Sequence, residues 1–320
     1  MRRVFLFIVT LLAVAGSQSL AFACSVCKCG DQAFFINNAR LLPRGTWVIS
    51  MENLYLNKSA LQHEAIADDH HHDWGLLKLR SPLNVSNGEE PGIESQQQNN
   101  LQIVVNYGLT DRLMLMASLP YTFNRFSQGT ERFRINGFGD PELMVMLHLS
   151  SFFNKSLQMA LIAGVRLPLG ETDYEKNGKE LHAHDQIGSG AVAGTFGLQL
   201  SRLTGALPIF FSANVQRHGA NNRNFRYGNV FRFNVATQHQ LSNRFDLIAE
   251  INGRAASFDK EGISTEPHSG GTVVYFSPGL RFNFIRAFAF RGQAQIPVVE
   301  KLHGVQDEKT NLRAGLVWTL

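Results

Sequence analysis

From position 46 to the C-terminus the chain repeats one unit, a stretch in which apolar and polar side chains alternate, followed by a break. Alternation with a period of two indicates a β-strand with one apolar and one polar face. A tilted strand needs ~9–11 residues to cross a bilayer, whereas strands of soluble proteins average about 5–6. The pattern predicts twelve long strands, at residues 46–57, 99–108, 112–123, 141–150, 157–167, 191–201, 207–218, 229–239, 244–254, 271–283, 287–298 and 310–320.

The connections between these strands alternate in length. The short ones follow every second strand, and the longer, polar ones lie at 58–98, 124–140, 168–190, 219–228, 255–270 and 299–309. Short periplasmic turns and long extracellular loops are typical of outer-membrane barrels, and a soluble β-sandwich would not sort its loops so regularly. We therefore expect an all-β, transmembrane antiparallel β-barrel of about twelve strands in the outer membrane of a Gram-negative bacterium, with both termini on the periplasmic side.

The alternation also assigns an outer face. Apolar side chains placed toward lipid are Leu113, Leu115, Leu119, Leu143, Val145, Leu147, Phe231, Phe233, Val235, Phe288 and Phe290. The aromatic residues near strand ends, where girdles belong, are Tyr55, Tyr107, Tyr121 and Trp318.

The inner face carries charges of both signs, since a charge facing lipid would cost several kcal/mol. The predicted lumen-lining residues are Glu52, Glu142, His148, Arg166, Arg232, Asp246, Glu250 and Arg291, accompanied by Asn106, Gln158, Asn214, Gln216, Asn234, Asn252, Gln293, Gln295 and Arg313. Two interpretations remain open: a polar pore, or a salt-bridge lattice that plugs a narrow barrel.

The C-terminus fits a strand that closes such a barrel. Alternation in the last ten residues runs to the chain end, where an ordinary edge strand would invite aggregation. The pattern formed by Arg313, Gly315, Trp318 and Leu320 resembles the C-terminal signal of bacterial outer-membrane barrels, although such chains more often end in Phe. We expect the barrel assembly machinery and outer-membrane lipid as partners.

The N-terminus predicts export. Arg2 and Arg3 precede an apolar run, and Ala21-Phe22-Ala23 forms a small-x-small cleavage site, so residues 1–23 are expected to be a signal peptide. Residues 24–45 would form a periplasmic segment and residues 46–320 the barrel. Without the two arginines, 28 basic residues face 26 acidic ones, and this balance does not imply a nucleic-acid partner. Cys24 directly after the cut leaves lipidation as an alternative.

Five phrases resemble one outer-membrane family. They begin at Tyr107 (YGLTDRL, continued by SLPY), Gly137 (GFGDPEL), Gly164 (GVRLPLG), Gly271 (GTVVYFSPGL) and Gln295 (QIPVV). In this order, over roughly 40–320, they resemble the family named for the meta-pathway of phenol degradation. The resemblance implies a transporter-like barrel that passes small molecules, aromatic ones included, with no catalytic residues.

All three cysteines, Cys24, Cys27 and Cys29, fall within six residues. In the oxidising periplasm a disulfide from Cys24 to either of the others is one interpretation. Three thiolates at this spacing also suit Cu(I) or Zn(II). Both interpretations remain open.

Two predicted extracellular loops carry histidines beside carboxylates, a combination that suits Zn, Cu, Ni or Co. These histidines are His63, His70, His71, His72, His182 and His184. They could meet above the pore, on the opposite side of the membrane from the cysteines, or belong to solvated polar loops.

The expected function is passage of a small solute, aromatic or metal-associated. The alternative is an envelope metal-binding or sensing barrel with a plugged lumen. An enzyme is disfavoured, because no motif that would activate a nucleophile surrounds Ser50, Ser118 or His148.

The cysteine segment generates the first prediction. Cleavage would place the Cys24 thiol beside a free α-amino group, so we expect the reduced protein to bind about one Cu(I) or Zn(II). Cys27→Ser should abolish binding while the barrel still assembles, and binding should weaken below the thiol pKa because ligation requires thiolates. The metal content of the reduced wild type and of the serine variants tests this prediction. Equal content in the wild type and the triple serine variant contradicts the metal role, and an intact mass increased by acyl chains would indicate lipidation.

Overall fold

The computed structural model describes residues 42–59, 95–128, 131–149, 157–203, 207–304 and 307–320. The expected signal peptide, the cysteines and His63, His70, His71 and His72 lie outside these residues. Within the described part of the chain, no helix is long and apolar enough to span a membrane.

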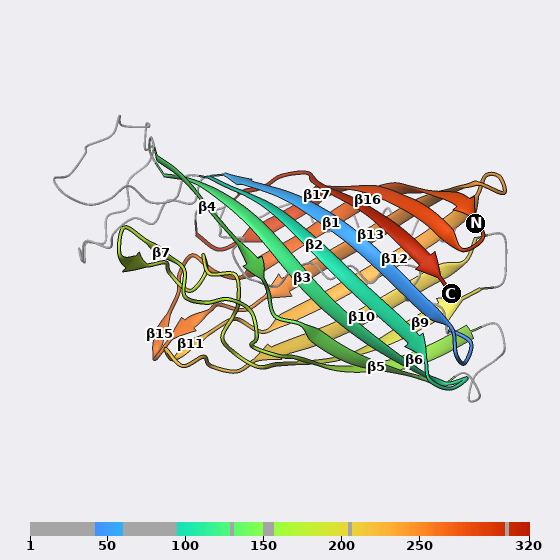
Figure 1. Cartoon of the computed structure of the whole chain (residues 1–320), viewed down its shortest axis with the longest axis horizontal. Coiled ribbons are helices and arrows are strands. Elements are labelled where there is room, and N and C mark those ends of the chain that lie inside the picture. The colour runs from blue at the N-terminus through green and yellow to red at the C-terminus, as the bar shows by residue number, and fades with distance from the viewer. Residues whose placement is uncertain (1–41, 60–94, 129–130, 150–156, 204–206, 305–306) are drawn as a thin grey trace, which may run out of the picture.

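The described residues form a closed antiparallel barrel of twelve strands, which confirms the predicted fold class (Figure 1). The first half is built from β1 (Trp47–Ser59), β2 (Ser95–Gly108), β3 (Leu113–Gln128), β4 (Glu131–Phe138) with β5 (Glu142–His148), β6 (Leu157–Arg166) and β9 (Ala193–Arg202). The second half comprises β10 (Ile209–His218), β12 (Val230–Gln240), β13 (Phe245–Ala256), β16 (Gly271–Ile285), β17 (Phe288–Leu302) and β19 (Asn311–Thr319).

Closure is made by β1, which pairs with β2 on one side and β19 on the other. The seam runs from Val48 opposite Thr319 to Tyr55 opposite Leu312. Backbone hydrogen bonds of 3.0 and 2.8 Å between Trp47 and Leu320 complete it. Leu320 therefore takes part in the pairing of β1 with β19. As a result, neither strand has an unpaired edge at the seam inside the membrane.

The two faces alternate as predicted. The inward residues of β5 are buried and the outward ones exposed in strict succession. On β19 the inward residues from Asn311 to Val317 are buried, and the outward ones are exposed except for the half-buried Leu316. Outward leucines and valines such as Leu143, Val145 and Val235 are 39–49% exposed, which forms the apolar surface that meets lipid.

Aromatic side chains gather where the strands begin and end. At the short-turn end, Trp47 lies 4.3 Å from Tyr107 between ring centroids, and Phe288 lies 5.9 Å from Trp318. At the loop end, Phe138 meets Tyr121 edge-on at 4.9 Å. These positions fit the interfacial girdles of a membrane barrel.

The prediction of a loop at 124–140 is wrong. β3 continues to Gln128 and pairs with β4, so this segment is a hairpin that extends the sheet. Its charged residues suggested a loop, but the inward alternation persists: Phe126 and Ile135 are buried against Ile187 of the β6–β9 connection. Packing against another loop thus extends these strands. β16 and β17 also extend beyond the predicted ends, to Ile285 and Leu302.

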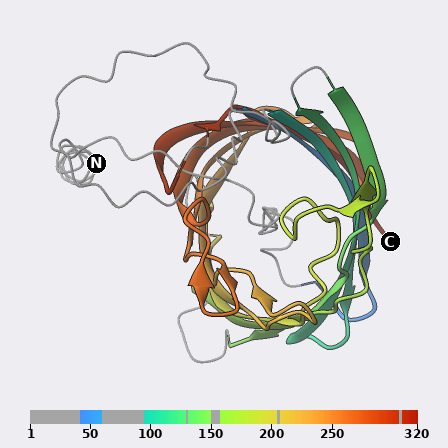
Figure 2. The same cartoon turned by 90° about the vertical axis from the view of Figure 1, so that its left-hand side faces the viewer.

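The loop end carries short strand pairs of its own. β7 (Glu175–Lys176) pairs with β8 (Lys179–Glu180), and β11 (Phe225–Arg226), β14 (Lys260–Glu261) and β15 (Ser264–Thr265) form a small sheet. β18 (Asp307–Glu308) extends the pairing of β1. The C-terminus lies at the opposite end of the barrel (Figure 1), and the view from the loop end shows the ring of strands (Figure 2).

If the outward face contacts lipid, a charged side chain placed on it should destabilise the barrel most near the middle of a strand. Val235 is the sixth of the eleven residues of β12 and faces outward. Val235→Arg should lower the free energy of unfolding by about 2–4 kcal/mol, because the charge would lie deep in hydrocarbon. Urea titration of heat-modifiable gel migration in lipid vesicles measures this. Asn222→Arg, in the exposed β10–β12 connection, is the matched control and should change stability by less than about 0.5 kcal/mol.

Candidate functional site

A chain of buried polar side chains runs along the inner wall across five strands. Arg166 on β6 lies 3.5 Å from the Glu142 carboxylate on β5. Thr195 donates to Glu142 at 2.9 Å, Gln216 donates to Thr195 at 3.1 Å, and Arg232 donates to Gln216 at 3.1 Å. The register of neighbouring strands places Glu142 opposite Arg166 and Thr195 opposite Gln216, and the contact between Glu142 and Thr195 crosses β6. The arrangement compensates one buried carboxylate and holds two guanidinium groups in fixed positions.

A second charged group occupies the wall formed by β13, β16 and β17. Arg291 donates to Glu250 at 3.2 Å, and Gln293 donates to the other oxygen of Glu250 at 2.6 Å. Ser277 donates to Asn252 at 2.7 Å beside this pair. Both charges are buried, so each depends on the other for compensation.

Glu52 joins this second group across the seam. In the register, Gly315 on β19 lies opposite Glu52 on β1 and opposite Arg291 on β17. A Cβ atom at Gly315 would lie 3.1 Å from Glu52 Cγ, so the glycine leaves room for the glutamate side chain. Glu52 interacts electrostatically with Arg313 and Arg291 across this gap.

Two further polar groups complete the described wall. Asp246 accepts from Gln238 at 2.8 Å and from Asn283 at 3.3 Å. At the loop end, Arg254 lies 3.1 Å from Glu308, which also accepts a hydrogen bond from Tyr275. The polar groups are thus distributed along the barrel rather than collected in one ring.

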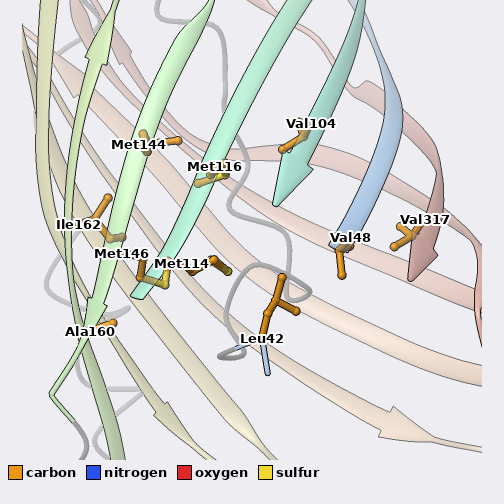
Figure 3. Close-up of a cluster of buried hydrophobic side chains, with 10 residues drawn as sticks. All are labelled: Leu42, Val48, Val104, Met114, Met116, Met144, Met146, Ala160, Ile162 and Val317. Atoms are coloured by element: carbon orange, nitrogen blue, oxygen red, sulfur yellow. The ribbon is translucent and has the colours of Figure 1, made fainter. Parts of the chain in front are cut away.

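One part of the inner wall is apolar (Figure 3). Four methionines on β3 and β5 form its centre, and the full cluster is Leu42, Val48, Val104, Met114, Met116, Met144, Met146, Ala160, Ile162 and Val317. Gly164 accommodates it, because a Cβ atom there would lie 2.4 Å from Met144 Cγ. This methionine patch, as we name it, lies toward the short-turn ends of these strands.

The order of the inward residues along a single strand explains why the inner wall changes from polar to apolar. Along β5 the inward residues are Glu142, Met144, Met146 and His148, so the carboxylate lies nearest the loop end. On β6 the inward Arg166 follows Ile162 in the same sense. The inner wall is therefore charged and hydrogen-bonded above the methionine patch on this side of the barrel.

The sequence-predicted inner residues lie as follows. Glu52, Glu142, His148, Arg166, Arg232, Asp246, Glu250 and Arg291 are all buried and occupy inward positions, and Gln158 is half-buried. Four of these residues form two ion pairs, Glu142 with Arg166 and Glu250 with Arg291. Sequence reasoning missed the methionines, although the same period of two that placed Leu113 and Leu115 outward also turns Met114 and Met116 inward.

The loop end brings His182 and His184 together, with ring centroids 4.8 Å apart. Their connection is held to the next one by Arg223, which pairs with Asp173 at 3.7 Å and with Glu180. Burial raises the pKa of Tyr174 in this connection, and the Glu171 carboxylate that accepts its hydrogen bond raises it further. The Tyr174 hydroxyl therefore remains a donor at neutral pH.

Comparison with solved structures agrees with the geometry. An outer-membrane channel from Pseudomonas putida F1 is similar with a TM-score of 0.64 and 13% sequence identity, over 88% of this chain and 98% of that one. The P. putida toluene transporter TodX gives a TM-score of 0.43 and 9% identity, over 87% and 90% of the chains. At such low identity the first likeness establishes the fold alone, and the second supports no conclusion.

Comparison with curated protein sequences finds no match. The family described as "Putative MetA-pathway of phenol degradation" matches residues 103–300. This match spans more than half of the chain and includes all five phrases that suggested the family. The chain therefore belongs to the putative MetA-pathway of phenol degradation family.

Proposed function

We propose that this protein is an outer-membrane channel for a small solute with an apolar, ring-sized body and a polar substituent, as in a phenol. The observation that carries the proposal is the divided inner wall, with hydrogen-bonded polar side chains beside a patch of four methionines. The family description, which concerns phenol degradation, supports this solute class, and the fold shared with an outer-membrane channel supports a role in passage.

The methionine patch suits a passing aromatic ring. Thioether–aromatic contacts are worth about 0.3–1.5 kcal/mol each, and the unbranched side chain adapts to irregular shapes. Conduction requires binding that is favourable enough for entry and weak enough for release. Several weak, adaptable contacts meet that condition better than one deep pocket would.

The polar wall suits the substituent of such a solute. Gln216 and Thr195 combine donors and acceptors in one chain of hydrogen bonds, to which a passing hydroxyl could bind in turn. Because Glu142 and Glu250 already pair with arginines, the wall offers a neutral solute polar groups without presenting a strong net charge. The passage that we propose requires no cofactor and no chemical step.

A solute test follows from the methionine patch. Met116→Gln combined with Met144→Gln should slow phenol entry into proteoliposomes severalfold, because each amide replaces an apolar contact surface by one that must be desolvated. The paired Met→Leu variant keeps the wall apolar and should retain entry. Fluorescence or absorbance of a trapped reporter measures the flux. Equal flux in the Gln and wild-type proteins would contradict the role of the patch, and no flux and no current in the wild type would indicate a plugged barrel.

A charge test follows from the polar wall. Arg166→Gln with Arg232→Gln should shift the reversal potential in planar bilayers toward cation selectivity, because Glu142 then loses its positive neighbours. Glutamine retains hydrogen-bonding capacity, and heat-modifiable migration reports whether the barrel still folds. Arg226→Gln, an exposed arginine on β11, is the matched control. An unchanged reversal potential in the double variant would show that these arginines do not face the ion path.

A further inference from the structure

We propose that His182, His184 and Glu266 form a zinc-class metal site that ties the β6–β9 connection to the β13–β16 connection at the loop end of the barrel. One ligand atom from each of the three side chains lies within 4.8 Å of the other two. Two imidazoles and one carboxylate are a donor set that suits Zn(II). The site goes beyond the proposed channel, whose inner wall requires no metal.

The three ligands differ in exposure in a way that fits an ion arriving from solvent. His184 is buried, Glu266 is half-buried and His182 is exposed. The two imidazole rings are stacked at 20°, with centroids 4.8 Å apart, so they present their edges side by side. The buried histidine and the glutamate define the base of the site, and His182 closes it from the solvent side.

A buried carboxylate orients the inner histidine. Asp259 Oδ2 lies 3.3 Å from His184 Nδ1, and both side chains are almost fully shielded from solvent. In metal sites a carboxylate on one imidazole nitrogen fixes the ring and raises the basicity of the nitrogen that binds the ion. Gly228 N–H donates to the other oxygen of Asp259, which holds the carboxylate in place. Asp259 is thus a positioning residue for this site.

The glutamate is held by the same loop that supplies Asp259. Glu266 N–H donates to the Asp259 carbonyl at 3.0 Å, and the Ser269 hydroxyl donates to the Glu266 carbonyl at 2.7 Å. Ser269 Oγ also accepts from Asp259 N–H at 2.8 Å. The backbone positions of the ligand Glu266 and of Asp259 are therefore fixed together.

Aromatic side chains of a third connection support the histidines. Phe225 meets His184 edge-on at 5.0 Å and His182 at 6.0 Å. Tyr227 donates its hydroxyl proton to the carbonyl of Ala183, between the two histidines, at 2.7 Å. The β10–β12 connection thus packs against the segment that carries the two histidines and supports their positions.

An ion would draw the two connections closer. Zn–N and Zn–O bonds of about 2.0–2.2 Å place tetrahedral ligand atoms roughly 3.3–3.6 Å apart. Since the ligand atoms now lie within 4.8 Å of one another, an approach on the order of 1 Å completes the geometry. The consequence is a cross-link between connections that flank the β10–β12 loop, on the same face from which a solute would enter.

Zinc titration of the full-length protein in detergent tests the site. With a chromophoric chelator as competitor, His184→Ala and Glu266→Gln should each lose one zinc equivalent relative to the wild type. Glu261→Gln, exposed in the same connection, and His239→Ala, exposed at the turn end, are matched controls and should bind as the wild type does. Asp259→Asn should weaken binding about 10–100-fold. Zinc bound elsewhere in the chain contributes equally to every variant, so it cancels when each variant is compared with the wild type.

A second readout tests the cross-link itself. Zinc should slow tryptic cleavage at Lys176 in the wild type and in the controls, and should have no such effect in His184→Ala. Replacing His70, His71 and His72 by alanine, outside the described residues, should leave this protection intact. The same zinc stoichiometry in His184→Ala and wild type would overturn the proposal, as would loss of the equivalent only in the His70–His72 variant.

Discussion

Closure of the sheet between β1 and β19 is the constraint on which the rest of the structure depends. In hydrocarbon an unpaired backbone group costs several kcal/mol, so every strand that faces lipid must be paired on both edges. The exchange of hydrogen bonds between Trp47 and Leu320 meets this requirement at the chain's last residue. Once the sheet is closed, each strand has one face toward lipid and one toward the interior, and side-chain chemistry follows from that division.

The interior is divided rather than uniform. Burying a charge is tolerable only with a partner. Here Arg166 meets Glu142 on the neighbouring strand, and Arg291 meets Glu250 across β16. The methionine patch occupies wall area where β3 and β5 place Met114, Met116, Met144 and Met146 inward. A barrel with both surfaces can accommodate a molecule that is itself partly apolar and partly polar, which is why the channel proposal names that class of solute.

Most of the fold could be predicted because a period of two is a local property of the sequence. Strand positions and the inward set from Glu52 to Arg291 follow from it, as does the turn-and-loop asymmetry. The β3–β4 extension could not be predicted, because it depends on Phe126 and Ile135 packing against Ile187, far along the chain. Glu266 and Asp259 were missed beside His182 and His184 for the same reason: only the folded loops bring them together.

The glycine at position 315 has a consequence for assembly. Before β19 enters the seam, Glu52 on β1 and Arg291 on β17 lie at opposite edges of an open sheet, and the guanidinium of Arg291 can pair with Glu250 alone. Insertion of the final strand brings them within interaction range across a residue that has no side chain to separate them. Backbone sealing and the burial of Glu52 beside Arg313 and Arg291 therefore occur in one event. An open sheet leaves the edges of β1 and β17 unpaired, and unpaired backbone groups cost several kcal/mol each in hydrocarbon, so the final strand both seals the sheet and completes the surroundings of Glu52.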